Sequence, residues 1–211
     1  MSLTILITGF GPFPGAAFNP TGVLAEELAR RRHPAFANIR RIAHVFPVSY
    51  DAVDRELPVL LASERPDALI MFGVATRSKH VRIETRARNT VARAVPDVAG
   101  DVPPSSSIRA GGPAALPLRT PAQRLLTAVR ATGVPVIISR DAGDYLCNYL
   151  CWRAAEAGSN GTPRVMSFVH VPQVTRSPIR RLGRARLSLD DLATMSEAVV
   201  RAAIPAARGL R

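Results

Sequence analysis

The 211-residue sequence has few of the residues that build metal centres and disulfide frameworks. It contains two cysteines, Cys147 and Cys151, and four scattered histidines, none of them at the ligand spacing of a tetrahedral metal site. A disulfide between two cysteines one helical turn apart would be geometrically strained. We therefore expect no metal, no cofactor and no structural disulfide.

The sequence also lacks any apolar run of the roughly 18–20 residues that cross a bilayer, so no membrane partner is expected. Its first residues, MSLTILI, have neither the basic segment nor the cleavage site of a secretory signal. Together with the scarcity of cysteine, these features predict a reducing, cytoplasmic location.

Acidic residues are outnumbered, with 16 Asp and Glu against 28 Lys and Arg and a formal net charge of +12. Such a charge raises the question of a nucleic-acid partner. Lys79 is the single lysine, however, and abundant arginine, alanine, proline and glycine indicate a coding bias. The arginine clusters at 30–32, 40–41 and 176–186 have no interleaved aromatic residues on which single strands stack. We therefore expect a solvated basic face and no nucleic-acid partner.

Hydrophobic residues make up 47% of the sequence, as in an ordinary globular protein. The length suits one domain that spans residues 1–211. Apolar runs predict strands at residues 3–8, 67–72, 134–139 and 164–169, and residues 39–46 are a further strand candidate. Alternation of Val81 and Ile83 with polar residues predicts a strand with one polar face at residues 80–84. Helical periodicity predicts helices at residues 22–32, 50–63, 120–132 and 189–203, and a further one beginning near Tyr145. This alternation predicts a three-layer α/β fold with a mainly parallel sheet.

Capping residues and helix- or strand-breaking residues indicate where some of these elements begin and end. Asn19 followed by Pro20 is typical of an N-cap and a first helical residue, and Ser188 has capping-box spacing to an aspartate three residues later. Pro58 predicts a kink or boundary in its helix, and Gly73 is expected to break the third strand. Residues 94–118, rich in Pro, Gly and Ser, are expected to form a long loop.

In open α/β sheets, sites gather where strands end. Three places qualify here: the loop after Thr8, the loop after Ser139 and the strand end at His170. Each therefore contributes candidate functional residues.

The glycines after the first strand suggest a dinucleotide-binding loop, but the pattern is incomplete. Pro14 stands where the third glycine belongs, and Pro12 and Pro14 lack the N–H donors that a pyrophosphate needs. We expect a turn instead, whose aromatic residues Phe10 and Phe13 either pack on neighbours or line a pocket.

Cys147 falls in the first turn of the helix expected near Tyr145, where the helix dipole stabilises a thiolate. Asp141, Gly143 or Asp144 is expected to cap that helix. Cys151, one turn further and beside Trp152, is expected to be a small buried residue. The alternative for Cys147 is that it, too, is a buried core cysteine.

A general base would favour the catalytic interpretation of Cys147. His170 ends a predicted strand, and a sheet order that places this strand beside the one ending at Ser139 would bring His170 near the thiol. Glu84 is the candidate carboxylate to orient the imidazole. Taken singly, His170 could be a core histidine and Glu84 part of a surface ion pair.

Several ordered motifs resemble the pyroglutamyl peptidase I, or pyrrolidone-carboxylate peptidase, family of cysteine exopeptidases. They are TGFGPFPGAAFNPT at 8–21, PVSY at 47–50, IETRARNTVARAVPDVAG at 83–100, SRDAGDYLCNYLCW at 139–152 and SFVHVP at 167–172. The resemblance implies an α/β/α sandwich around a twisted, mainly parallel, mixed sheet of the phosphorylase/hydrolase-like type. It covers nearly the whole chain.

The resemblance also implies roles for individual residues. Cys147 corresponds to the nucleophile, His170 to the general base and acid, and Glu84 to the orienting carboxylate. The residues that correspond to the substrate-binding positions are Phe10, Phe13, Asn19, Tyr145 and Leu146. The implied reaction releases an N-terminal pyroglutamyl group from peptides through a thioacyl-enzyme, in an assembly that is expected to be a homotetramer.

The sequence departs from the family pattern at several positions, among them Ala92, which stands where the family has an aspartate. Ala94 stands where the family has an arginine, and Val74 stands where it has a glutamine. Arg88 or Arg93 is a candidate to supply the missing positive charge. These departures motivate an alternative hypothesis, a retuned or inactive relative that binds or cleaves a different small acyl ligand.

Overall fold

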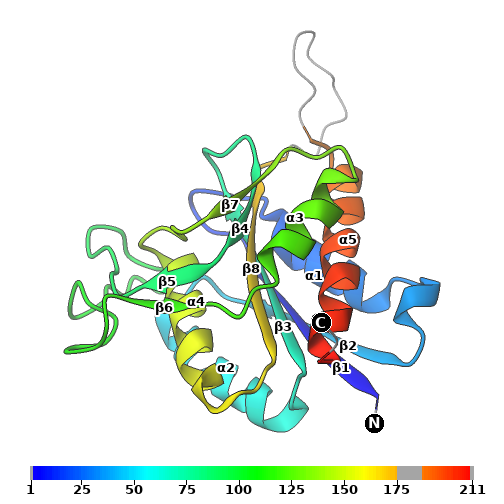
Figure 1. Cartoon of the computed structure of the whole chain (residues 1–211). Coiled ribbons are helices and arrows are strands. Elements are labelled where there is room, and N and C mark those ends of the chain that lie inside the picture. Colours follow the sequence, from blue (N-terminus) through cyan, green and yellow to red (C-terminus); the bar gives the residue numbers. More distant parts are fainter. Residues whose placement is uncertain (1, 175–186, 210–211) are drawn as a thin grey trace, which may run out of the picture.

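The computed structural model describes residues 2–174 and 187–209. Within them, a six-stranded sheet lies between two layers of helices (Figure 1). The sheet strands are β1 (Leu3–Phe10), β2 (Ile39–Phe46), β3 (Ala68–Ala75), β4 (Val81–Glu84), β7 (Val136–Ser139) and β8 (Val165–Pro172). The helices are α1 (Pro20–Arg30), α2 (Tyr50–Glu64), α3 (Ala122–Arg130), α4 (Leu146–Ala157) and α5 (Leu189–Ala207), with short 3₁₀ turns at Pro34–Phe36 and Gly158–Asn160. The predicted three-layer α/β/α fold is confirmed.

The strand order is β2-β1-β3-β8-β4-β7. The strands β2, β1, β3 and β8 are parallel to one another, whereas β4 is antiparallel to β8 and parallel to β7. The sheet is therefore mixed and mainly parallel, as expected. β4 lies between β8 and β7, so the strand order that we considered, with the His170 strand beside the Ser139 strand, is not the one that occurs.

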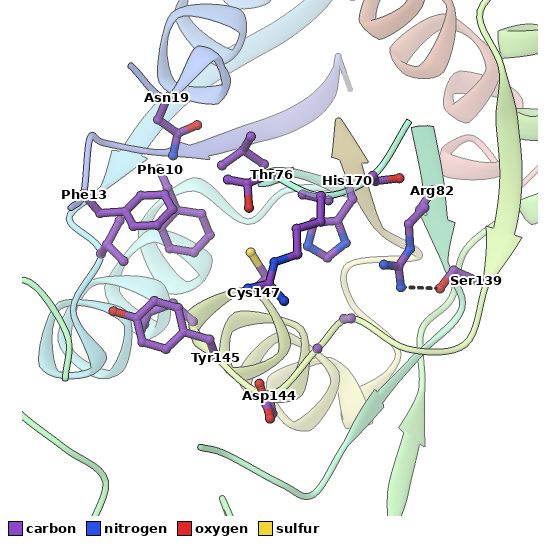
Figure 2. Close-up of a pocket in the computed structure, with 18 of the residues that line it drawn as sticks. Phe10, Phe13, Asn19, Thr76, Arg82, Ser139, Asp144, Tyr145, Cys147 and His170 are labelled. Atoms are coloured by element: carbon purple, nitrogen blue, oxygen red, sulfur yellow. Dashed lines mark hydrogen bonds between the residues drawn. The ribbon is translucent and has the colours of Figure 1, made fainter. Parts of the chain in front are cut away.

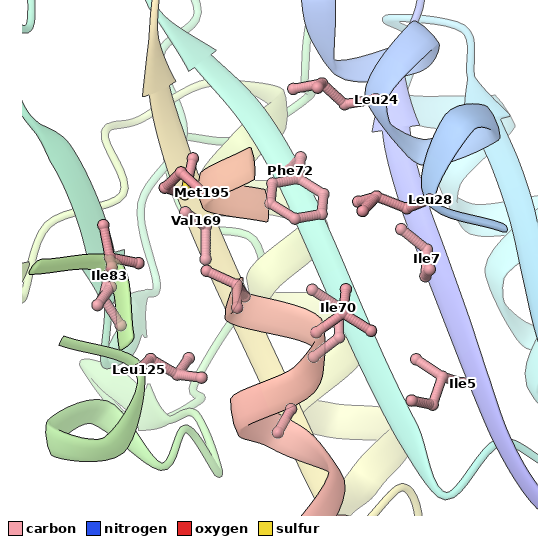
Figure 3. Close-up of a cluster of buried hydrophobic side chains, with 14 of the residues drawn as sticks. Ile5, Ile7, Leu24, Leu28, Ile70, Phe72, Ile83, Leu125, Val169 and Met195 are labelled. Carbon is pink, nitrogen blue, oxygen red and sulfur yellow. The ribbon is translucent and has the colours of Figure 1, made fainter. Parts of the chain in front are cut away.

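Both faces of the sheet are buried, which is why its central strands are apolar throughout. In β1 all eight residues are buried; Ile5 and Ile7 pack under α1 and α5, and Leu6 packs on the opposite face. Figure 3 shows the first of these cores, where residues of α1, α3 and α5 meet the sheet. The second core joins α2 and α4 to the other face.

The predicted helix signals are found in the structure. The side chain of Asn19 accepts a hydrogen bond from the amide of Thr21, and Pro20 is the first residue of α1. Ser188 and Asp191 form a complete capping box at the start of α5. These local contacts satisfy amide groups that have no partner inside the helix.

Neither Gly73 nor Pro58 ends the element that contains it. Strand β3 runs through Gly73, which is directly opposite His170 in the ladder with β8. Helix α2 continues through Pro58 to Glu64, because Leu57 before the proline and Leu61 after it pack on the same core. In both cases long-range packing outweighs a local breaker.

The segment at 94–118 is a loop for most of its length, but it ends in a strand, β6 (Ala115–Pro117). This strand pairs antiparallel with β5 (Arg86–Arg88), which the sequence pattern did not reveal. The arginine cluster at 176–186 lies outside the described residues. No helix within 2–174 and 187–209 is long and apolar enough to span a membrane.

Candidate active site

A cavity of about 740 Å³ opens where β1, β3 and β8 end and α4 begins (Figure 2). Its lining includes most of the expected site residues, namely Phe10, Phe13, Asn19, Tyr145, Leu146, Cys147 and His170. Glu84 lies behind this lining and is fully buried. The lining also includes Ser139, the last residue of β7, so all three places that the sequence indicated contribute to one cavity.

Cys147 is the second residue of α4 and is partly exposed to the cavity. This exposure argues against the alternative of a buried core cysteine. The expected cap by Asp141, Gly143 or Asp144 is wrong: Tyr145 occupies the N-cap position, and no side chain of the described residues caps α4. The Asp141 carboxylate instead accepts a hydrogen bond from the amide of Gly143, inside the preceding turn. The first-turn amides of α4 thus keep their donors for a group in the cavity.

His170 lies near the end of β8 with its ring buried against Phe168, the two ring centroids being 4.8 Å apart. Its Nδ1 is 2.9 Å from Oε1 of Glu84 on the neighbouring strand β4. Figure 2 shows the Cys147 sulfur on the cavity side of the same ring. His170 therefore lies between the thiol and the carboxylate.

The pKa of His170 reflects these neighbours. Burial lowers the pKa of His170. The negative charge of a Cys147 thiolate, a hydrogen bond with Cys147 and the contact with Glu84 raise this pKa by more than burial lowers it, so that its value is about 9. The imidazole is therefore protonated at neutral pH when the thiolate is present.

Glu84 is fully buried, so it is not a surface ion pair. Its Oε1 contacts both His170 Nδ1, at 2.9 Å, and Arg82 Nε, at 3.2 Å. Its Oε2 has no hydrogen-bond partner among the described residues. A buried carboxylate held in this way is oriented by its two cationic neighbours.

Cys151 has a different environment from Cys147. It is fully buried in the core between α4 and the sheet, and burial raises the pKa of its thiol well above the ordinary value. The expectation that the two cysteines are unequal is confirmed, and both are free.

One side of the cavity is apolar. Phe10 is buried there and Phe13 is partly exposed, while the Tyr145 hydroxyl donates to the carbonyl of Pro96. Asn19 also lines this side, but its amide group holds the loop: Nδ2 donates to the Gly11 carbonyl, and Oδ1 caps α1. This side therefore presents aromatic side chains of the kind that commonly line small-ligand sites.

The two candidate replacements for the missing arginine have other partners. Arg88 lies 3.0 Å from Asp141 Oδ1, and Arg93 donates to the carbonyl of Pro103. Neither is part of the cavity lining, and Ala94 is exposed on the long loop. Val74, in contrast, does line the cavity.

Three further residues shape the site and were missed by sequence reasoning. Gly73 faces Cys147, Arg82 contacts Glu84, and the buried side chain of Asn148 binds backbone groups of residues 88 and 90. The position of Asn148 directly after Cys147 in a matched motif was a usable signal for it. For Gly73 and Arg82 the decisive partners are distant in sequence.

Residues 3–208 match the family model described as pyroglutamyl peptidase. The chain is 33% identical to the pyrrolidone-carboxylate peptidase of Clavibacter michiganensis subsp. michiganensis over 201 residues, which cover 95% of this chain and 92% of the relative. It is 28% identical to that of Pyrococcus furiosus, with 88% of each covered. The solved structure of the pyrrolidone carboxyl peptidase from Thermococcus litoralis superposes with a TM-score of 0.83 at 28% identity, covering 97% of this chain and 94% of the other. The chain therefore belongs to the pyroglutamyl peptidase family.

Proposed function

We propose that this protein is a cysteine exopeptidase that hydrolyses the bond between an N-terminal pyroglutamyl group and the rest of a peptide. The observation that carries the proposal is the arrangement of Cys147, His170 and Glu84 at one cavity, supported by family membership. We further propose that residues 1–211 act as one catalytic domain.

In the proposed reaction, the Cys147 thiol transfers its proton to His170, and the thiolate attacks the carbonyl carbon of the pyroglutamyl group. The C–N bond breaks, and the leaving nitrogen takes the proton from His170, which gives a thioester and a shortened peptide. His170 then accepts a proton from water, whose oxygen attacks the thioester. Pyroglutamate leaves, and the thiol is restored.

The surroundings of these residues support the assigned roles. Glu84, at 2.9 Å from Nδ1, keeps the other ring nitrogen of His170 available for proton transfer. A pKa of about 9 for His170 matches a residue that is protonated beside a thiolate and can donate to the leaving nitrogen. The first-turn amides of α4, which no side chain of the described residues caps, suit the oxyanion of the tetrahedral intermediate.

The apolar side of the cavity is the proposed slot for the lactam ring. We assign Phe10, Phe13, Tyr145 and Leu146 to this slot and Asn19 to the support of its loop. A peptide with pyroglutamate at its N-terminus is thus the proposed partner. The alternative, a retuned or inactive relative, rests on Val74 and Ala94. The experiment described next tests both hypotheses.

The experiment compares wild type, Cys147→Ala and Cys151→Ala on a pyroglutamyl-arylamide. We expect hydrolysis by wild type and by Cys151→Ala, and none by Cys147→Ala or after treatment with iodoacetamide. Activity that survives in Cys147→Ala would overturn the proposal. A folded wild type without activity on this substrate would favour the retuned relative.

The family resemblance leads us to propose a homotetramer. From the scarcity of cysteine and the nature of the basic charge we further propose a cytoplasmic location and no nucleic-acid partner. Light scattering on the purified protein measures its mass against the 22.7 kDa chain. Retention on heparin with a steep salt dependence would contradict the expectation about nucleic acid.

A further inference from the structure

Arg82 is directly opposite His170 in the antiparallel ladder between β4 and β8. Its Nε lies 3.2 Å from Glu84 Oε1, and the same oxygen lies 2.9 Å from His170 Nδ1. A guanidinium and an imidazole therefore share one buried carboxylate oxygen. The catalytic interpretation of Cys147, His170 and Glu84 alone does not account for this guanidinium.

The other end of the Arg82 side chain reaches the strand β7 and the loop that follows it. Its Nη2 donates to Ser139 Oγ at 2.9 Å (Figure 2). The same nitrogen also donates to the carbonyl oxygen of Asp141. That loop leads within a few residues to Cys147. Arg82 thus connects the carboxylate behind His170 to the segment that carries the thiol.

Arg82 is also the remaining candidate for the positive charge that the family's arginine supplies and Ala94 lacks. Arg88 and Arg93 bind groups outside the cavity, as described above. Arg77 and Arg82 line the cavity, and among the described residues Arg82 is the arginine in contact with Glu84. Its side chain is 28% exposed, so part of it faces the cavity.

We propose that Arg82 is a positioning residue for the reaction, which acts through Glu84 on His170. It holds the carboxylate in one orientation and weakens its pull on the imidazolium, since two cations bound to one oxygen repel each other. This inference rests on the proposed function for the roles of Cys147 and His170. It assigns to Arg82 the positive charge that Ala94 does not supply.

The charged and titratable groups around His170 allow a direction to be worked out. Cys147 faces it from α4, and Glu84 and Arg82 face it from β4; Arg77 and Asp144 also line the cavity but are exposed. Without the Arg82 charge, the Glu84 carboxylate interacts with His170 as its single cationic neighbour among the described residues, and the pKa of His170 rises. The basic limb of any process that depends on this imidazolium then moves to higher pH.

The test uses Arg82→Gln, which removes the charge, and Arg82→Lys, which keeps the charge but not the planar fork. Arg86→Gln is the matched control, because Arg86 binds the carbonyl of Arg140 in the same loop and has no contact with Glu84 among the described residues. All variants are made in a Cys151→Ala background, so that Cys147 is the single thiol. Thermal melts establish that each variant is folded.

The first readout is the pH dependence of Cys147 alkylation by iodoacetamide, which requires no turnover. We expect the basic inflection to move upward by about half a pH unit or more in Arg82→Gln and to stay in place in Arg82→Lys and in the control. The second readout is steady-state kinetics, in which kcat falls about tenfold in both Arg82 variants while KM changes little.

An alkylation profile of Arg82→Gln that superposes on that of wild type would overturn the inference. If Arg82→Gln does not fold, an unchanged kcat in Arg82→Lys would overturn it equally. Because alkylation does not depend on peptide cleavage, a wild type that fails to cleave the arylamide would contradict the proposed function while this test still gives its answer.

Discussion

A β-carbon placed on Gly73 would lie 2.8 Å from the Sγ of Cys147. The same β-carbon would lie 2.6 Å from Cζ of Phe168, the ring that packs against His170. Strand β3 therefore passes beside the thiol at the one residue type without a side chain. The proposed nucleophile keeps its place because this glycine leaves room for it.

We predict that Gly73→Ala lowers kcat/KM by about a hundredfold, since a shift of the order of 1 Å in a reacting atom has this effect. The thiol and the Phe168 ring must both move to accommodate the methyl group. Assays on a pyroglutamyl-arylamide measure the loss. Gly11→Ala is the control, because its new β-carbon would be 3.7 Å from the carbonyl oxygen of Phe46, an ordinary contact. Equal activity of the two variants would contradict the prediction.

A second prediction concerns the basic limb of the pH profile. Glu84 contributes to raising the pKa of His170 to about 9, so Glu84→Gln removes that contribution and lowers this pKa. The protonated imidazole is then lost at lower pH, and the basic limb of kcat/KM moves downward. This direction is opposite to the one expected for Arg82→Gln. A limb that stays in place when measured from neutral to alkaline pH would show that Glu84 does not act on His170.

Phe13 provides a test of the apolar slot. It lines the cavity and is partly exposed, so a bound lactam ring would cover it. We expect Phe13→Ala to raise KM by about tenfold or more with little change in kcat, because the lost apolar contact exists in both ground state and transition state. Val59→Ala, at a residue of α2 that is 63% exposed, serves as the control. A KM equal to that of wild type would place the ring elsewhere.

The attachment of α4 to α2 can be tested without reference to activity. The Tyr149 hydroxyl donates to Asp54 Oδ2 at 2.7 Å and accepts from Arg153 at 2.8 Å; burial, followed by the bond to Asp54, raises its pKa to about 12. We expect Tyr149→Phe to lower the free energy of unfolding by about 1–2 kcal/mol in urea titrations, because the Asp54 carboxylate and the Arg153 guanidinium each lose their hydrogen bond to this hydroxyl.

Tyr50→Phe is the matched control for this prediction. The Tyr50 hydroxyl is buried and has no hydrogen-bond partner among the described residues, so its removal is expected to be neutral or stabilising. Equal destabilisation by the two substitutions would mean that the Asp54 bond contributes nothing specific.

Much of the fold followed from local patterns. The apolar run of β1 is long and rich in β-branched residues. The caps at Asn19 and Ser188 use hydrogen bonds between residues two or three positions apart, so the sequence alone indicates them. The motifs around Cys147 and His170 likewise indicated two of the residues that the structure brings to one cavity. The break expected at Gly73 does not occur and Pro58 is not a helix boundary, because glycine and proline express a local preference that packing can override.

Local patterns in the sequence therefore indicated, by themselves, most of the helices and sheet strands and the side chains proposed to react, although not the pairing of β5 with β6. The tertiary structure alone decided that β4 lies between β8 and β7, and so brings Glu84 and Arg82 beside His170. It also decided that Glu84 is buried and that Gly73 faces the thiol. The physical reason is that strand order and burial depend on pairings between residues far apart in the chain, and no local pattern encodes such pairings.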